Sequence, residues 1–179
     1  MTEASFVPDA ANARALRDAL GRFATGVTVV TIATAGDPMG ITANSFASVS
    51  LDPPLVLWSL NTNSPSLSMF RDGSHFTVNI LAQEQANLSQ RFASRIPNKF
   101  EGVEFRTGAG GTPLIVDCAA WLECRTYSHQ DAGDHILFIG EVERFERTEK
   151  KPLIFCGGKY IFSEREADAA TLANWGWGI

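Results

Sequence analysis

Short runs of β-branched and aromatic residues, separated by turn-forming clusters, constrain the fold of this chain more than any other feature. Three runs, at 26–34, 55–60 and 75–80, each have the length of one strand. A turn cluster with Gly, Asp and Pro follows the first run at 35–38, and Asp-Pro-Pro precedes the second run at 52–54. The pattern therefore predicts a mainly β protein built from consecutive short strands.

The rest of the chain adds strands and a few helices. We expect 39–51 to return beside 26–34 as a hairpin, 94–113 to be irregular, and further strands at 114–128, 135–146 and 153–162. Helices are predicted at 11–22, from Ser64 to Gly73, and at 83–93. Many strands with few helices favour an antiparallel barrel with helical caps over a doubly wound α/β fold.

Length and composition exclude several classes of protein. A chain of 179 residues is expected to form one domain, and its net charge of -5, without a dense Lys/Arg block, argues against nucleic-acid binding. The apolar runs are shorter than the ~20 residues that span a bilayer, and the first residues do not resemble a secretion signal. Cys118, Cys124 and Cys156 lack CxxC spacing. We therefore expect no disulfide framework or zinc site, and a cytoplasmic location.

Common catalytic motifs are missing from the sequence. No GxGxxG follows a strand, and there is no GxxxxGK[ST], HExxH or GxSxG. The histidines His75, His129 and His135 are scattered, so no metal site is expected.

A concentration of small polar residues at 42–50 is the first candidate for a binding site. Five of its nine residues carry a hydroxyl or amide side chain, whereas a strand buried on both faces is rich in Val, Ile and Leu. Such a strand suits a flat ligand rich in heteroatoms. An edge strand that faces water would explain the pattern equally well.

Three further segments carry candidate ligand groups. Ser64 and Ser66 lie at a predicted helix start, where amides without helical partners bind anions, although a plain N-cap has the same sequence. Arg91, Arg95 and Lys99 form the most basic segment, which suits a phosphate or a solvated helix face. Gly133-Asp134-His135 places a histidine at a strand mouth, facing a cleft or capping the strand.

Seven motifs occur together in one order: GRFATGVTVVT (21–31), GITANSFASVSLDPPLVLWSL (40–60), NSPSL (63–67), FTVNIL (76–81), SQRFAS (89–94), KFEGV (99–103) and GDHILFIGEV (133–142). In this combination the chain resembles the flavin reductase family with an FMN-binding split-barrel fold. The resemblance covers roughly residues 12–163. It implies a six-stranded antiparallel Greek-key barrel with flanking helices, a homodimer, and a flavin at the dimer interface.

The resemblance also implies roles for individual residues. The isoalloxazine edge is expected to contact Thr42, Ala43, Asn44 and Ser45, and the pyrimidine end and ribityl chain are expected to contact Ser48, Val49 and Ser50. Ser64 and Ser66 are expected near the phosphate, and Arg91, Phe92 and Lys99 near the phosphate or its adenylate extension. Arg95, from the same basic segment, is a further candidate for cofactor binding. His135 is expected to lie against the nicotinamide and to position it, without a role in proton transfer.

The implied function is transfer of hydride from NADH or NADPH, with NADH preferred, to FMN or FAD. The reduced flavin would then serve a monooxygenase partner, ferric complexes or quinones. Alternatives are a flavin carrier or sensor without catalysis, and a structural barrel whose polar strand faces solvent. Residues 1–10 and 164–179 are expected to be tails. Trp58 is bulkier than the family pattern suggests, and Trp175 and Trp177 fall outside it.

Overall fold

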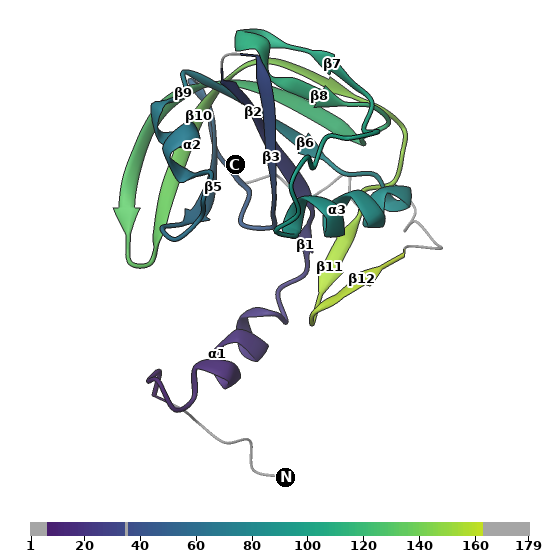
Figure 1. The fold of residues 1–179 in the computed structure, drawn as a ribbon. Coiled ribbons are helices and arrows are strands. Elements are labelled where there is room, and N and C mark those ends of the chain that lie inside the picture. The colour runs from purple at the N-terminus through teal and green to yellow at the C-terminus, as the bar shows by residue number, and fades with distance from the viewer. Residues whose placement is uncertain (1–6, 35, 163–179) are drawn as a thin grey trace.

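The structure, a computed structural model, describes residues 7–34 and 36–162 (Figure 1). The predicted N-terminal segment 1–10 lies partly outside these residues. The predicted C-terminal segment 164–179, with its two tryptophans, lies wholly outside them.

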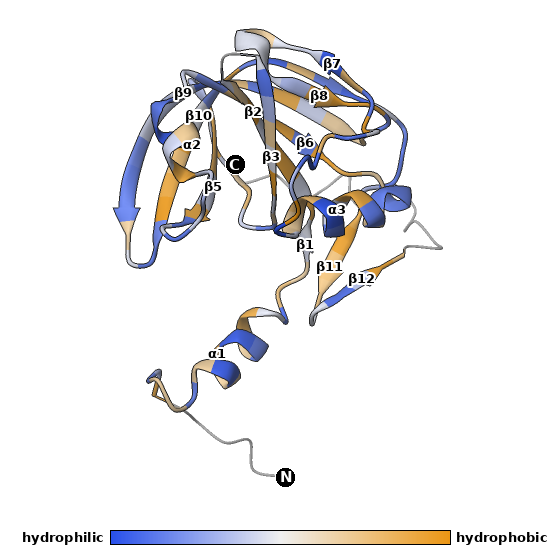
Figure 2. Ribbon diagram, in the orientation of Figure 1, coloured by the Kyte–Doolittle hydropathy of each residue, from blue (hydrophilic) through white to orange (hydrophobic). Residues whose placement is uncertain are grey.

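The predicted first helix forms, but it stands away from the strands. Helix α1 (Ala13–Leu20) contributes no buried residue, and Figures 1 and 2 show it apart from the body, with hydrophilic residues along much of its length. Apolar side chains here are nevertheless exposed, as Leu20 (66%) and the following Phe23 (77%) show. Within the described part of a single chain, these groups therefore remain uncovered.

Within the described residues, seven antiparallel strands form the main sheet, in the order β3 (Asp37–Ala43), β2 (Thr28–Thr34), β6 (His75–Ile80), β9 (Ala120–Ala132), β10 (His135–Arg147), β5 (Pro54–Asn61) and β4 (Ala47–Leu51). The two edge strands, β3 and β4, are consecutive in the chain and joined by residues 44–46. Because four Cα steps span at most about 14 Å, the two edges must curl toward each other. The predicted mainly β, antiparallel architecture is confirmed.

Smaller elements cover this sheet. They are a three-stranded sheet of β1 (Thr25–Gly26), β11 (Ile154–Cys156) and β12 (Lys159–Ile161); the pair β7 (Phe105–Thr107) and β8 (Pro113–Ile115); helices α2 (Leu67–Asp72) and α3 (Ala86–Ala93); and the 3-10 turns η1 (Gln83–Gln85) and η2 (Ala109–Gly111). The helix predicted at 83–93 and the strands predicted at 55–60, 75–80 and 135–146 are confirmed.

Four predicted strands are divided in the structure. The stretch 26–34 is split between β1 and β2, and 114–128 is split between β8 and β9. The sequence pattern predicts one strand at 39–51, but the chain leaves β3 after Ala43, and β4 pairs with β5. This division is why the main sheet has seven strands where six are expected. The stretch 153–162 folds back on itself at Gly157 and Gly158, whose φ angles of 57° and 80° favour glycine. It therefore forms the short hairpin of β11 and β12.

An aromatic cluster fills the inside of the curved sheet. Trp58 is fully buried and stacks on Phe138, with ring centroids 4.9 Å apart and planes 16° apart. Phe70 of α2 meets the indole edge-on, also at 4.9 Å. The unusual bulk of Trp58 is therefore core packing, and α2 is held against the sheet by its one buried residue, Phe70.

A second buried cluster holds α3 against β3. Phe92 is fully buried, and its ring lies over Gly40 so closely that a Cβ there would be 2.7 Å from the ring. The hydroxyl of Thr42 also donates to the carbonyl of Ser89 at 2.6 Å. Both contacts tie the same helix to the same edge strand.

Gly40→Ala is expected to lower the free energy of unfolding by about 1–3 kcal/mol, because a core this tight resists an added methyl group. Gly26→Ala is the matched control, since a Cβ there meets nothing within 4 Å. Urea unfolding of both variants tests the contact. Equal stability of Gly40→Ala and wild type would contradict it.

Two of the cysteines are expected to be unreactive in the folded protein. Burial raises the pKa values of Cys118 and Cys124 to about 12, whereas Cys156 is only partly buried. Because the thiolate is the nucleophile, a thiol reagent at neutral pH should modify Cys156 first and the other two only after unfolding. Rapid native labelling of Cys124 would contradict this.

The same shifts predict how stability depends on pH. An unfolded thiol ionises near pH ~8.5, but the buried thiols keep their protons up to about pH 12. The unfolded state therefore loses protons first, so stability should fall as the pH rises from about 8.5 toward 12. Urea midpoints of wild type and Cys124→Ala across this range test the sign, since the variant should show the shallower fall.

Candidate functional site

A large cavity opens at the end of β3, where the chain leaves this edge strand of the main sheet. Its volume is about 1220 Å³, somewhat above the ~300–1,000 Å³ of ordinary small-molecule pockets. Three segments and one histidine form its lining: residues 37–45 except Gly40, residues 59–66 except Thr62, residues 93–101, and His135. A ligand as large as a flavin nucleotide fits this space.

The cavity brings together most of the predicted site residues. Those that line it are Thr42, Ala43, Asn44, Ser45, Ser64, Ser66, Arg95, Lys99 and His135. Five predicted residues are not part of the lining: Ser48, Val49, Ser50, Arg91 and Phe92.

The residues 48–50 lie on β4, beyond the point where the chain turns away from the cavity. Val49 is 42% exposed, and the Ser50 hydroxyl accepts a hydrogen bond from the amide of Asp52. Within one chain Ser48 and Val49 are exposed and Ser50 is half-buried. The single strand expected at 39–51 would have kept them in line with residues 42–45, but the turn at 44–46 separates the two groups.

Phe92 does not line the cavity, although the resemblance places it near the phosphate. Its ring is fully buried beneath Gly40, on the core side of α3. Arg91 and Arg95 do not share a helix face either, because α3 ends at Ala93 and Ser94 is extended. Of the two arginines, only Arg95 reaches the cavity.

The segment before α2 also differs from its prediction. The helix begins at Leu67, later than the predicted start at Ser64, and the amides of Ser66 and Leu67, which the sequence predicts to be free, both have partners. The Leu67 amide donates to the carbonyl of Ser64 at 3.1 Å, and the Ser66 amide contacts the Ser64 hydroxyl at 3.4 Å. The hydroxyls of Ser64 and Ser66 lie 3.0 Å apart at the cavity wall. An anion bound here would therefore contact the hydroxyl groups of this segment and not unpaired helix amides.

Two hydroxyls of the polar stretch hold the cavity walls in place. Ser45 accepts a hydrogen bond from the Ser59 amide at 3.0 Å, and its hydroxyl donates to the Ser59 carbonyl at 3.2 Å. The Thr42 hydroxyl is bonded to Ser89 of α3. These two hydroxyls already have protein partners. A ligand in the cavity would therefore contact the backbone of this segment and the side chain of Asn44.

His135 lies at the cavity mouth as the first residue of β10, opposite Asn61 of β5. Its Nδ1 lies 2.7 Å from the carboxylate of Asp134, and this hydrogen bond lowers the pKa of that carboxyl. The carbonyl of Asp134 accepts from the amide and hydroxyl of Thr62, at 2.9 and 3.1 Å. The hairpin tip is thereby attached to the loop that leads to Ser64, and Nε2 is the ring nitrogen left for a ligand.

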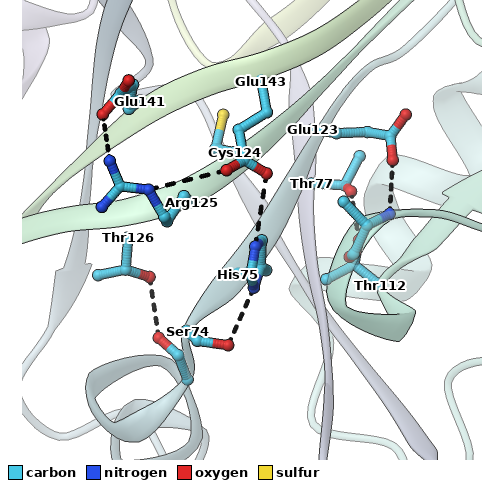
Figure 3. Close-up of polar contacts among 12 residues, drawn as sticks. Ser74, His75, Thr77, Thr112, Glu123, Cys124, Arg125, Thr126, Glu141 and Glu143 are labelled. Atoms are coloured by element: carbon cyan, nitrogen blue, oxygen red, sulfur yellow. Dashed lines mark hydrogen bonds and ion pairs between the residues drawn. The ribbon is translucent and has the colours of Figure 1, made fainter.

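The other two histidines serve elsewhere. Figure 3 shows His75 between the Ser74 hydroxyl, 2.9 Å from Nδ1, and the Glu143 carboxylate, 3.4 Å from Nε2. None of these three residues lines the cavity. His129 lies against the ring of Phe138, with centroids 6.0 Å apart. His135 is thus the one histidine of the three that reaches the site.

Comparison with known proteins agrees with this geometry. The sequence profile described as "Flavin reductase like domain" matches residues 20–162. The chain belongs to this family. The resemblance carried by the seven motifs is therefore confirmed.

Individual relatives of this flavin reductase-like protein share most of its length. It is 45% identical over 155 residues, 87% of this chain and 88% of the relative, to "FMN reductase (NADH) SmoA" of Agrobacterium fabrum. It is 47% identical over 149 residues, 83% of this chain, to "Flavin-dependent trigonelline monooxygenase, reductase component" of Acinetobacter baylyi. The chain spans about half of that relative (48%) and of a "Probable flavin reductase" from Rhizobium meliloti (51%).

A solved structure is also similar. The NADH:FAD oxidoreductase SgcE6 of Streptomyces globisporus, in complex with NAD and FAD fragments, superposes with a TM-score of 0.86 at 35% identity. The match covers 92% of this chain and all of that chain (100%).

Sequence reasoning missed several residues of this flavin reductase-like site. The loop residues Ile96, Pro97 and Asn98 line the cavity, as do Asn61 and Asn63. The sequence pattern predicts an irregular segment at 94–113 and assigns a role only to its basic residues Arg95 and Lys99, not to the three residues 96–98. Asn61 and Asn63 could have been found, because they closely precede the predicted Ser64 site, whereas Ile96, Pro97 and Asn98 carry no local signal of a binding role.

No helix within the described residues is long and apolar enough to cross a membrane. In the same residues, no group of three or more His, Cys, Asp or Glu side chains is placed to hold a metal ion.

Proposed function

We propose that this chain is an NADH-dependent flavin reductase that transfers hydride from the nicotinamide to FMN or FAD. The observation that supports this best is the cavity itself. It combines a polar backbone segment at 42–45, the paired hydroxyls of Ser64 and Ser66, and a histidine at the mouth. The family to which the chain belongs and the names of its relatives, "FMN reductase (NADH)" among them, agree with this chemistry.

The residues present fit a flavin nucleotide. Segment 42–45 is small and polar enough to lie against a flat ring system, and the lining supplies hydroxyl, amide and guanidinium donors for a phosphate. When bound, the flavin itself supplies the hydride chemistry, so the protein needs no side-chain nucleophile. The cavity thus fits a flavin nucleotide in the hydrogen-bond donors that it supplies and in its volume.

The protein residues would then bind, orient and stabilise charge. Backbone amides at 43–45 would stabilise negative charge that develops on the ring system, as amides do in an oxyanion hole. Ser64, Ser66 and Arg95 would hold the phosphate. His135, fixed through Nδ1 by Asp134, would position the nicotinamide through Nε2.

The remaining parts of the proposal concern assembly and use of the product. We propose a cytoplasmic homodimer of six-stranded Greek-key barrels, counting β3 and β4 as one bent strand. The exposed Leu51 (72%), Leu20 (66%) and Phe23 (77%) support a subunit interface, because large apolar side chains gain stability when a partner covers them. A monooxygenase partner that takes up the reduced flavin follows from the relative named as a reductase component.

Anaerobic titration tests the proposed function. Purified protein with FMN, and separately with FAD, should lose its yellow absorption band when NADH is added, and NADPH should act more slowly. Steady-state NADH oxidation with FMN, FAD and ferric chelates then identifies the acceptor. If neither NADH nor NADPH bleaches a bound flavin, the protein is a carrier or sensor. If no flavin binds, the polar strand has only a structural role.

His135→Ala is expected mainly to raise the KM for NADH, with kcat at saturating NADH little changed, because His135 positions the nicotinamide. His129→Ala, whose side chain lies outside the cavity, is the matched control. A loss of about 10³-fold in kcat with binding intact would assign His135 a direct chemical role.

A further inference from the structure

The cavity wall formed by residues 94–101 has no regular secondary structure of its own. Helix α3 ends at Ala93, and the next strand begins at Phe105. A loop of this length would pay a large ordering cost on ligand binding unless the protein holds it in shape beforehand. Side chains on and beside the loop provide the necessary interactions.

Arg91 provides two of these interactions. Its Nε donates to the carbonyl of Lys99 at 2.7 Å, and a terminal guanidinium nitrogen donates to the carbonyl of Glu101 at 2.7 Å. These acceptors lie eight and ten residues further along the chain, so one planar side chain spans the whole loop. Among the described residues Arg91 forms no ion pair with a carboxylate, and it does not line the cavity. Its donors face the loop backbone.

Lys99 holds the loop from the other side. Its ammonium group donates to the carbonyl of Phe92 at 2.6 Å, and burial lowers the pKa of this group. The ring of Phe100 meets that of Phe92 edge-on, with centroids 5.0 Å apart. The loop is thereby attached to α3, the helix that packs against Gly40 and Thr42 of β3.

Arg95 differs from both residues. It lines the cavity, lies within the loop that Arg91 spans, and forms no ion pair in the part of the chain that the structure describes. Two arginines four residues apart therefore have different surroundings: one meets backbone carbonyls and one faces the cavity.

We infer that Arg91 is a positioning residue, which shapes the 94–101 wall by its two carbonyl bonds, and that Arg95 is the arginine that meets the ligand phosphate. This inference rests on the proposed function, because it concerns how the same cavity binds a flavin. It assigns to Arg91 a role different from the phosphate contact that the basic segment suggests.

The two roles predict different ligand dependence. Loss of a positioning residue weakens every ligand that contacts the wall, whereas loss of a phosphate ligand weakens only ligands that carry a phosphate. Riboflavin and FMN form the matched pair of probes, since they share the ring and ribityl chain and differ in the phosphate.

The experiment compares dissociation constants of FMN and riboflavin for wild type, Arg91→Met and Arg95→Met, by fluorescence titration. Arg91→Met should weaken both probes by a similar factor, about tenfold or more, since charge-assisted hydrogen bonds are lost. Arg95→Met should weaken FMN and leave riboflavin nearly unchanged. If Arg91→Met weakens FMN alone, Arg91 is a phosphate ligand and the inference is wrong.

Arg91→Lys is a second, more conservative variant. It distinguishes the effect of the positive charge from that of the planar guanidinium group. Lysine keeps the charge but lacks the planar fork that reaches two carbonyls. It should therefore behave like Arg91→Met, whereas retention of wild-type FMN affinity would overturn the inference. Thermal midpoints of all variants show whether each one is folded.

Limited trypsin cleavage after Arg95 gives a second readout that needs no flavin. The loop should be cut faster in Arg91→Lys than in wild type, and an unchanged rate would contradict the positioning role. If wild type bound neither probe, the proposed function would fail, and the cleavage rates alone would decide whether Arg91 holds the loop.

Discussion

The close contact between Phe92 and Gly40 is the interaction on which the site depends most. It lets α3 lie directly on the edge strand β3, because position 40 has no side chain to keep the ring away. The Thr42 hydroxyl secures the same junction two residues further along the strand. The loop at 94–101 leaves from the end of this helix, so the distance between the two walls of the cavity follows from one ring packed on one glycine.

The second constraint is the break in the chain after Ala43. An uninterrupted strand would have placed the whole polar stretch 42–50 along one sheet edge. The reciprocal hydrogen bonds between Ser45 and Ser59 anchor the turn to β5. Residues 42–45 consequently line the cavity, whereas residues 48–50 lie outside it on β4.

Much of the fold could be predicted from local patterns, because strand length, helical spacing and turn residues are local properties. The strand at 75–80 and the helix at 83–93 are examples. The division of 39–51 could not be predicted, since the Ser45 hydroxyl bonds to the backbone of residue 59, fourteen residues away in sequence. The contacts of Arg91 with loop carbonyls and of Phe92 with Gly40 could not be predicted for a similar reason. The sequence shows that a residue is basic or aromatic, but not whether its partner is a ligand, a carbonyl or a glycine. His135 was predicted correctly as a cavity residue because a Gly-Asp turn places the next residue at a strand mouth.

Together these constraints make the space between residues 42–45 and the 94–101 loop the proposed flavin site. A crystal structure of the protein with FMN tests this most directly. We expect the ring system against residues 42–45, the phosphate beside Ser64, Ser66 or Arg95, and the guanidinium of Arg91 still bonded to the loop carbonyls. FMN bound elsewhere on the protein, with this cavity left to solvent, would contradict the proposed site.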